Sequence, residues 1–365
     1  MSALLEKIKK NSKLGKLKTL NKSEFLNNGD NTPTDMPVLN LAFSGEIDKG
    51  FRSGLIQIAG PSKHFKTNLA LICVKSYLKK NPDAICLFFD SEFGITEEYL
   101  KAQGIDPERM VHIPIMNVEE LKFELLAQLE GIARGDKVII LIDSIGNLAS
   151  KKEVEDALNE KSVADMSRAK QLKSLFRMAT PYLTMKDIPM IGINHTYKEQ
   201  GLFPKDIVGG GTGAMYSSNV VFIIGRAQEK DGSEVSGYTF TLNVEKSRDV
   251  KEKSKLKFKV LFESGVCEYS GLLDIAMASG FVKKPSSGWY QRVINGQPED
   301  KRYREKDTEN KEFWDPIISD SKFKEACSKI FKLQSGKHSE IEDDIDLNEI
   351  DDDAIDIPSI SDEDE

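Results

Sequence analysis

The sequence predicts an α/β fold in which a central, mostly parallel sheet is covered by helices on both faces. Short apolar runs alternate along the chain with segments of helical periodicity, and each run is continuously apolar. Strands that are buried on both faces of a sheet have this pattern, and parallel strands need a crossover helix between them. A short N-terminal arm and a small C-terminal α+β region complete the predicted architecture.

The first half of the chain shows the clearest alternation. Buried strands are predicted at residues 55–59, 85–89, 111–115 and 138–142. Helices are predicted at residues 66–80, 95–103 and 118–134. In the last of these helices, Leu121, Leu125 and Leu129 recur at a spacing of four, as expected for one apolar face.

The pattern changes after residue 143. A polar segment at 150–165 and a long glycine-rich segment at 196–218 are both predicted to be loops, and loops of that length in a compact domain are usually functional. Between them lie a helix at 166–185 and a buried strand at 189–193. The later strands are predicted to join the sheet antiparallel, at residues 220–224, 238–244 and 256–262. The predicted C-terminal region comprises residues 271–289 and 313–333.

Charge is unevenly distributed along the 365 residues. The whole chain has 59 acidic and 51 basic residues and a net charge of −8, which taken alone disfavours a polyanionic partner. Residues 339–365, however, contain fourteen acidic residues and no Lys or Arg. The first 338 residues therefore have 45 acidic and 51 basic residues, a net charge of +6. A basic body with an acidic tail favours nucleic acid as the partner.

Composition also argues against several classes of protein. With 39% hydrophobic residues the chain can bury a substantial core. The longest aliphatic run, residues 138–142, is far too short to span a bilayer, and no apolar stretch of a secretory signal follows the first lysines. The 4 cysteines show no CxxC spacing, so neither a zinc site nor a disulfide framework is expected. These features favour a reduced, cytoplasmic compartment.

A candidate phosphate-binding loop follows the first strand. It consists of Gly60, Pro61, Ser62, Lys63, His64, Phe65, Lys66 and Thr67. The pattern G-x-x-x-x-G-K-[ST] fits except at Phe65, where it has its second glycine. Such a loop directs backbone N–H groups at phosphates, Lys66 would reach the β- and γ-phosphates, and Thr67 would bind Mg²⁺. If Phe65 needs a positive φ, the strain is about 1–2 kcal/mol; alternatively, a small rearrangement of the loop accommodates the side chain.

Two other predicted strands end in carboxylates. Asp143 follows the run 138–142, as in a Walker B strand, where it can hold a water of Mg²⁺. Asp90 and Glu92 follow the run 85–89, and a carboxylate there can orient a water for attack on a γ-phosphate. Alone, each of these residues is also typical of a turn or helix cap. The ordered combination with the phosphate loop favours a nucleotide site.

Taken together, these motifs resemble those of the RecA family of homologous recombinases, over roughly residues 37–335. The matching segments are the loop at 60–67, Phe89-Asp-Ser-Glu-Phe-Gly-Ile-Thr96, Ile142-Asp-Ser-Ile-Gly-Asn-Leu-Ala-Ser-Lys-Lys152, Ile193-Asn-His-Thr196, Gly209-Gly-Gly-Thr-Gly213 and Val244-Glu-Lys-Ser-Arg248. Phe65 points to the branch of the family found in phages. The resemblance implies a RecA-type core with ATP and Mg²⁺ as cofactors.

The resemblance also assigns roles to single residues. Glu92 corresponds to the catalytic glutamate and Tyr99 to the tyrosine that stacks on adenine. His195 stands where the family has a polar sensor, often glutamine. Lys246 and Arg248 correspond to the cations that reach the γ-phosphate of a neighbouring protomer. The implied catalytic residues are Lys66, Glu92, His195, Lys246 and Arg248, and the implied metal ligands are Thr67 and Asp143.

The family's two mobile DNA loops correspond to residues 150–165 and 196–218. Aromatic side chains can stack on bases, basic ones can contact phosphates, and glycines let the backbone approach them. The predicted DNA-binding residues are Tyr197, Phe203, Lys205, Gly209, Gly210, Gly211, Arg168 and Lys170.

The predicted domain organisation has four parts. Residues 1–36 form an N-terminal helix and arm for protomer contacts, anchored on the neighbour by residues 20–26 and especially Phe25; alternatively, this segment is a disordered basic arm. Residues 37–270 form the ATPase core and 271–338 the small C-terminal region. Residues 339–365 are predicted to be a disordered acidic tail that competes with DNA, recruits accessory proteins or acts only as a solubilising segment.

The predicted function is that of an ATP hydrolase that depends on single-stranded DNA. It would form helical filaments and catalyse homologous pairing and strand exchange in recombination, repair and recombination-dependent replication. Implied partners are single- and double-stranded DNA, further copies of the chain, a recombination mediator, a single-stranded-DNA-binding protein and a helicase, with no membrane, in the cytoplasm of a bacterium infected by a phage. The alternatives are a hexameric RecA-core helicase and a non-enzymatic, ATP-gated DNA-coating protein. The pair Lys246 and Arg248 favours the filament over the ring, and Glu92 with Asp143 favours hydrolysis.

Overall fold

The structure is a computed structural model that describes residues 3–14, 17–23, 25, 30–159, 167–198, 206–209 and 212–333. Residues 1–333 form one compact unit. The acidic tail and the other remaining residues lie outside the described part of the chain, so the predictions made for them are untested. No helix within the described ranges is long and apolar enough to cross a membrane.

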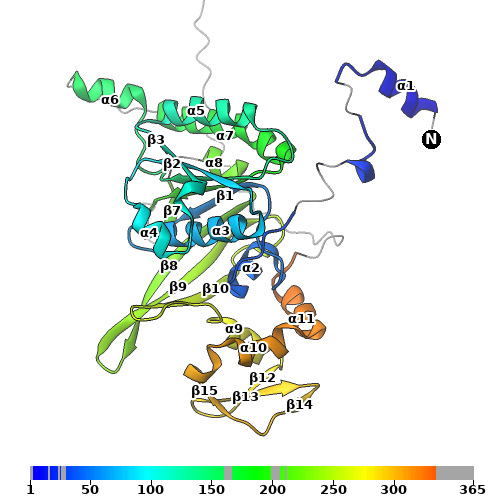
Figure 1. Ribbon diagram of the computed structural model, residues 1–365, viewed down its shortest axis with the longest axis vertical. Coiled ribbons are helices and arrows are strands. Elements are labelled where there is room, and N and C mark those ends of the chain that lie inside the picture. Colours follow the sequence, from blue (N-terminus) through cyan, green and yellow to red (C-terminus); the bar gives the residue numbers. More distant parts are fainter. Residues whose placement is uncertain are drawn as a thin grey trace, which may run out of the picture. The chain divides into compact units, whose positions relative to one another are not determined.

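The described strands build a nine-stranded sheet with the order β11-β10-β9-β8-β1-β5-β4-β2-β3 (Figure 1). The parallel part consists of β1 (Gly54–Ala59), β2 (Ile85–Asp90), β3 (Met110–Pro114), β4 (Val138–Asp143), β5 (Pro189–Asn194) and β8 (Val220–Asp231). The antiparallel part consists of β9 (Glu234–Ser247), β10 (Lys255–Leu261) and β11 (Gly265–Cys267). The predicted α/β architecture with a mostly parallel core is confirmed.

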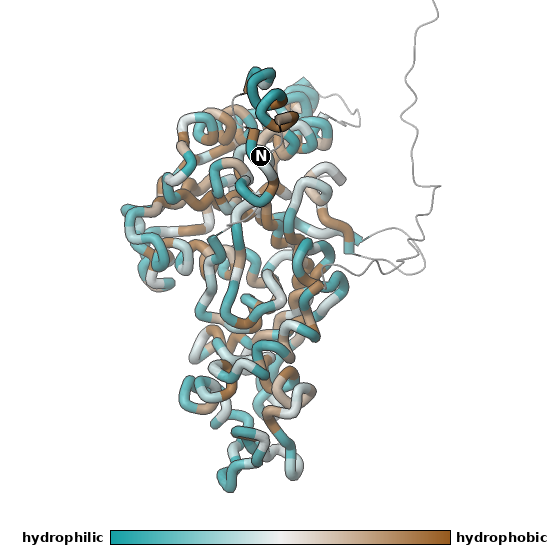
Figure 2. Tube along the Cα trace, turned by 90° about the vertical axis from the view of Figure 1, so that its right-hand side faces the viewer, coloured by the Kyte–Doolittle hydropathy of each residue, from teal (hydrophilic) through white to brown (hydrophobic). Residues whose placement is uncertain are grey.

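Helices cover both faces of the parallel strands because successive side chains of a strand point to opposite faces. Ile56 and Ile58 lie in the hydrophobic cluster that includes α3 (Lys66–Lys80), whereas Leu55 lies in the cluster that includes α5 (Val118–Gly131) and α7 (Ser167–Lys186). Figure 1 shows α5 and α7 side by side on one face and α3 on the other. In the hydropathy colouring of Figure 2, brown stretches in the interior alternate with teal turns.

Two strand predictions were wrong. The strand at 220–224 was expected to be antiparallel, but β8 pairs with β1 in parallel, with Ile56 opposite Val220. The long connection from β5 to β8 acts as a crossover and returns the chain in the same direction. The strand at 111–115 was expected to be buried, but β3 lies at the edge of the sheet and Val111 is 42% exposed.

Both predicted loops contain regular structure. In the first, α6 (Lys151–Leu158) begins with a capping box, in which Ser150 and Glu153 each accept a hydrogen bond from the other's backbone N–H. In the second, β6 (Thr196–Lys198) pairs with β7 (Asp206–Val208), and α8 (Thr212–Ser217) follows. The capping pattern S-x-x-E was therefore a helix signal that the prediction missed.

The remaining elements flank the core. They are α1 (Ala3–Asn11), α2 (Pro37–Ser44), α4 (Glu97–Ala102), α9 (Leu272–Ala278), β12 (Val282–Ser286), β13 (Trp289–Ile294), β14 (Gln297–Pro298), β15 (Tyr303–Arg304), α10 (Lys311–Ile318) and α11 (Ser321–Phe331). Trp314 and Phe323 of the C-terminal region belong to the same hydrophobic cluster as α2 and α3. Phe25, the predicted anchor on a neighbour, lies with its ring 5.2 Å from the guanidinium carbon of Arg134 in its own chain.

Candidate nucleotide and DNA-loop site

The candidate site lies where the carboxyl ends of β1, β2, β4 and β5 meet. In a parallel sheet these ends lie at one edge, where ligands of open α/β folds bind. A cavity of about 460 Å³ opens there, lined by the phosphate loop together with Glu92, Asp143 and His195. The residues predicted from three separate motifs are thus brought to one place.

The phosphate loop leads directly into α3. Phe65 is the N-cap of that helix and has φ 60° and ψ 17°, so it occupies the left-handed region that favours glycine. Of the two alternatives for this position, the structure has the one with positive φ. The Phe65 ring lies 5.2 Å from the ring of Phe240 and 5.8 Å from that of Phe258, so aromatic packing against β9 and β10 offsets the strain.

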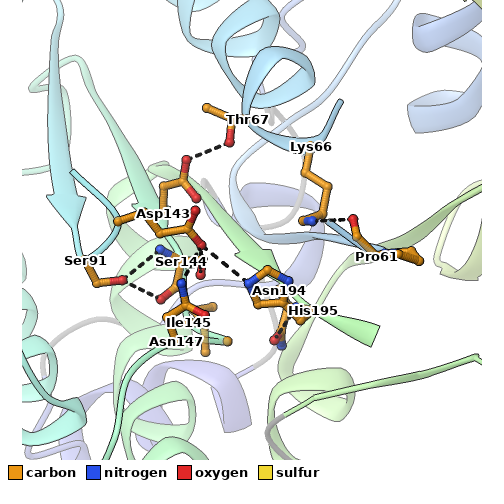
Figure 3. Close-up of polar contacts among 12 residues, drawn as sticks. Pro61, Lys66, Thr67, Ser91, Asp143, Ser144, Ile145, Asn147, Asn194 and His195 are labelled. Carbon is orange, nitrogen blue, oxygen red and sulfur yellow. Dashed lines mark hydrogen bonds and ion pairs between the residues drawn. The ribbon is translucent and has the colours of Figure 1, made fainter. Parts of the chain in front are cut away.

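Thr67 and Asp143 face each other across the site. Oγ1 of Thr67 donates to Oδ2 of Asp143 over 2.8 Å (Figure 3). Asp143 is 4% exposed, and its Oδ1 is buried without a hydrogen-bond partner among the described residues. Burial raises the pKa of Asp143 to about 6, against the opposing hydrogen bond from Thr67. A buried carboxylate oxygen beside a hydroxyl is a donor set suited to a magnesium ion and its waters.

Lys66 is the cation closest in sequence to this pair. Its Nζ donates to the carbonyl oxygen of Pro61 over 2.8 Å, which folds the ammonium group back over the phosphate loop (Figure 3). Burial lowers the pKa of Lys66, while Glu92 and Asp143 oppose that shift. The residue is 8% exposed, so its charge is concentrated on the interior of the loop.

Glu92 is held by a turn that Asp90 closes. Oδ1 of Asp90 accepts from the backbone N–H groups of Glu92 and Phe93, over 3.0 and 2.8 Å. Oε1 of Glu92 accepts from Oγ of Ser144 over 2.6 Å and from Nδ2 of Asn147 over 2.9 Å. The helix that follows is capped by Thr96 instead. Asp90 is thus the turn cap, and the Glu92 side chain remains in the site.

His195 joins the same group of residues from β5. Its Nε2 lies 3.4 Å from Oε1 of Glu92. Gly146 allows this close approach, because a Cβ atom at that position would lie 2.3 Å from Cδ2 of His195. Ser144, Asn147 and His195 converge in Figure 3. Sequence reasoning missed Ser144 and Asn147, although both follow the strand-terminal Asp143 inside a segment already singled out.

The expected adenine contact, Tyr99, lies at the other side of the phosphate loop. Its hydroxyl donates to Oδ1 of Asn68, the residue after Thr67, and the ring is half-buried. Arg226 was not predicted: its Nη1 donates to the carbonyl oxygen of Lys63 over 3.0 Å, and its guanidinium carbon lies 4.7 Å from the ring centre of Tyr238. Arg226 and Tyr238 both line the cavity. Arg226 lies on β8, which is next to β1 in the sheet but far from the loop in sequence, so no local pattern reports it.

Lys246 and Arg248 lie at the end of β9 and differ in their surroundings. Nζ of Lys246 donates to the carbonyl oxygens of Met215 and Tyr216, each over 2.9 Å, at the C-terminal end of α8. Burial and the nearby Arg248 lower the pKa of Lys246. Arg248 is exposed, and its side chain makes no hydrogen bond or ion pair with the described part of the chain. Neither cation lines the cavity of its own chain.

The structure places the predicted DNA contacts in different surroundings. Tyr197 is 55% exposed on β6, and Lys170 is exposed on α7. Arg168 departs from the prediction, because its guanidinium donates to the carbonyl oxygens of Ile145, Gly146 and Leu148. The N–H of Gly209 donates to the carbonyl oxygen of His195, and the carbonyl oxygen of Gly209 accepts from the side-chain amide of Asn194. The other predicted contacts lie outside the described residues: Phe203, Lys205, Gly210 and Gly211.

Comparisons with known proteins agree with the geometry. The RecA N-terminal domain family matches residues 1–267, and the family of the C-terminal domain of the bacteriophage T4 recombination and repair protein matches residues 269–327. The chain belongs to the RecA family, and a nucleotide-binding core comes with that membership.

Individual relatives refine this assignment. The chain is 52% identical over 328 residues to the recombination and repair protein of Enterobacteria phage T4, covering 88% of this chain and 84% of that protein. It is 28% identical over 300 residues to the RecA protein of Clostridioides difficile, covering 80% and 84%. The RecA protein of Bacteroides thetaiotaomicron is 27% identical over 293 residues, with coverage of 80% and 86%. Phe65 pointed to the phage branch of the family, and the similarity to this phage protein, UvsX, confirms that prediction.

Proposed function

We propose that this chain is a DNA-dependent ATPase that forms helical filaments on single-stranded DNA and catalyses homologous pairing and strand exchange. Membership of the RecA family supports recombination and repair as its role. The observation that carries the proposal is that Glu92 contacts Asn147 and His195, which lie just before the first and the second candidate DNA loop. Nucleotide chemistry and DNA binding then share one set of side chains.

The phosphate loop and its partners fit ATP and Mg²⁺. Thr67 and Asp143 would hold the magnesium ion, which supplies charge neutralisation on the β- and γ-phosphates when bound. Lys66 neutralises phosphate charge from the other side of the loop. Tyr99 and the cavity wall that contains Tyr238 offer faces on which an adenine ring stacks.

Glu92 is the proposed residue that orients water for hydrolysis. Its carboxylate lies in the cavity beside Asp143, and its second oxygen, Oε2, makes no hydrogen bond with the described residues. A carboxylate in that place can accept a proton from the attacking water. His195, in contact with Glu92, is the proposed sensor between the γ-phosphate and the second loop.

Lys246 and Arg248 are the proposed cations that act on a neighbouring protomer. The exposure of Arg248 and its position outside its own cavity support this role. A cation supplied in trans stabilises the charge that spreads over the transferred phosphoryl group. Hydrolysis would therefore depend on assembly, and assembly on DNA.

The DNA surface is proposed to include Tyr197 and Lys170 together with the loop residues outside the described ranges. Arg168 is proposed to position the first loop in place of the predicted phosphate contact. We also propose a recombination mediator, a single-stranded-DNA-binding protein and a helicase as partners, and the cytoplasm of an infected bacterium as the location.

Two measurements test this function. ATP hydrolysis should be strongly stimulated by single-stranded DNA and be lost in Glu92→Gln. Electron microscopy with single-stranded DNA and a non-hydrolysable ATP analogue should show right-handed helical filaments. Closed rings, or duplex unwinding without strand exchange, would instead identify a hexameric helicase.

A further inference from the structure

Each candidate DNA loop is closed at its base by hydrogen bonds. At the first loop, the hydroxyls of Ser150 and Ser167 lie 2.8 Å apart, which joins the residue before α6 to the start of α7. At the second, Asn194 donates to the carbonyl oxygen of Gly209 over 2.7 Å, and the Gly209 N–H donates to the carbonyl oxygen of His195 over 2.9 Å. The first loop is therefore closed across its two ends, and the second is closed between its start and Gly209.

The base of the first loop is also connected to Glu92. Arg168, at the start of α7, holds three carbonyl oxygens of residues 145–148 over 2.6, 2.9 and 3.1 Å. This short segment carries Asn147, whose amide donates to Oε1 of Glu92 over 2.9 Å. Because Arg168 links the segment to α7, a displacement of the loop is transmitted to Asn147.

Three groups share a single oxygen of Glu92. Ser144 and Asn147 donate to Oε1, and Nε2 of His195 lies 3.4 Å from it. Hydrogen bonds to a carboxylate oxygen occupy the lone pairs that would otherwise accept a proton from water. They also fix the direction in which the carboxylate points.

The two hydrogen-bond donors differ in freedom of movement. Ser144 is fully buried, and both its N–H and its C=O are bonded to the hydroxyl of Ser91, at 3.0 and 2.9 Å. Asn147 is exposed, on the segment that Arg168 connects to the loop. The bond from Asn147 is therefore the one that a movement of the first loop can break without disturbing the Walker B strand.

We propose that Asn147 is a positioning residue that restrains Glu92 in the absence of DNA, and that DNA bound to the first loop withdraws its amide and releases the carboxylate. The inference rests on the proposed function, in which Glu92 activates water. It adds the physical reason for the DNA dependence of hydrolysis: one carboxylate is bonded to the base of a DNA-binding loop.

Asn147→Leu tests the inference, because leucine matches asparagine in size and has no donor. The hydrolysis rate without DNA should rise about tenfold, the weight of one hydrogen bond to a charged group. The rate with saturating DNA should change by less than about twofold, since DNA has already broken that bond. Asn147→Gln, which keeps an amide, should restore part of the restraint.

Gln128→Leu is the matched control. Its amide donates to Oε1 of Glu124 over 2.7 Å on α5, and neither residue lines the cavity, so its loss should leave both rates unchanged. A melting temperature measured for each variant verifies the fold, and Asn147→Ala replaces Asn147→Leu if the leucine variant does not fold.

The outcomes separate the inference from the proposed function. If wild-type hydrolysis is stimulated by DNA and Glu92→Gln is inactive, but Asn147→Leu keeps the wild-type ratio of the two rates, the restraint is wrong and the function stands. An equal fall of both rates would also overturn it, by making Asn147 a support of the active arrangement. If wild-type protein shows no DNA-stimulated hydrolysis, the proposed function itself fails.

Discussion

The phosphate loop and the end of β9 are two halves of one proposed site. Within a single chain, the side chains of the first half have partners, and Arg248 of the second half does not among the described residues. At the phosphate loop, Lys66 and Asp143 are buried, Lys66 donates to the carbonyl oxygen of Pro61, and Thr67 donates to Asp143. At the end of β9, Arg248 is exposed and has no partner among the described residues. This difference fits the proposal that one protomer binds nucleotide alone, whereas hydrolysis needs a second copy.

The largest effect is expected at the phosphate loop. Lys66→Ala removes the cation that neutralises the β- and γ-phosphates and should lower DNA-stimulated hydrolysis by at least about 10³-fold. A colorimetric phosphate assay measures this, with Lys79→Ala at the far end of α3 as the control. Retention of hydrolysis by Lys66→Ala would show that the phosphate-loop assignment is wrong.

The next effect should appear only in assemblies. Arg248→Ala should lower DNA-stimulated hydrolysis by about 10²-fold or more, while nucleotide binding to isolated protomers is unchanged. An equal mixture of Arg248→Ala and Lys66→Ala proteins should recover roughly a quarter of wild-type activity, because a heterologous interface pairs intact pockets with intact arginines at random. No recovery on mixing would place Arg248 in its own protomer's site and remove the contrast between the two halves.

The sequence predicted the phosphate-loop half of the site better than the half at the end of β9. Residues 60–67 and Asp143 are adjacent to strands whose apolar pattern is strong, so their meeting at one sheet edge follows from the fold class. The position of Lys246 against α8 depends on a hydrogen bond between two distant elements, and no local pattern reports it. Arg168 looked like a DNA contact because its charge is visible in sequence, whereas the carbonyl oxygens it binds are not.

In the phosphate-loop half, the buried Asp143 should make the stability of the folded protein depend on pH. Burial raises the pKa of Asp143 from 3.8 to about 6, so the folded state favours the protonated acid and its charged form is destabilising above that pH. Asp143→Asn should therefore be more stable than wild type near pH 8, by at most about 3 kcal/mol, and the difference should shrink as pH falls toward about 4. Urea unfolding in EDTA measures this, with the exposed Glu98→Gln as the control. A difference that is independent of pH would assign the effect to hydrogen bonding.

Phe65 tests how the phosphate loop offsets its own strain. Phe65→Gly relieves about 1–2 kcal/mol of backbone strain but loses aromatic packing, for a net destabilisation of about 1–2 kcal/mol. Phe65→Ala loses the same packing and keeps the strain, so it should be less stable than the glycine variant by about 1 kcal/mol. Urea unfolding of the two variants gives the comparison, and an alanine variant as stable as the glycine variant would contradict a strained φ at this position.

The smallest effect separates the two cations at the end of β9. Lys246→Ala removes two hydrogen bonds to the carbonyl oxygens of Met215 and Tyr216 and should lower the free energy of unfolding of the protomer by about 1 kcal/mol. Arg248→Ala should change it by less than about 0.5 kcal/mol, because an exposed side chain without partners contributes little. Equal losses would mean that Arg248 is also anchored within its own chain. If Lys246 leaves α8 to reach a neighbouring phosphate, hydrogen exchange of the α8 amides should quicken on assembly with ATP, so the C-terminal end of the second DNA loop would be loosened by the cation that completes the adjacent site.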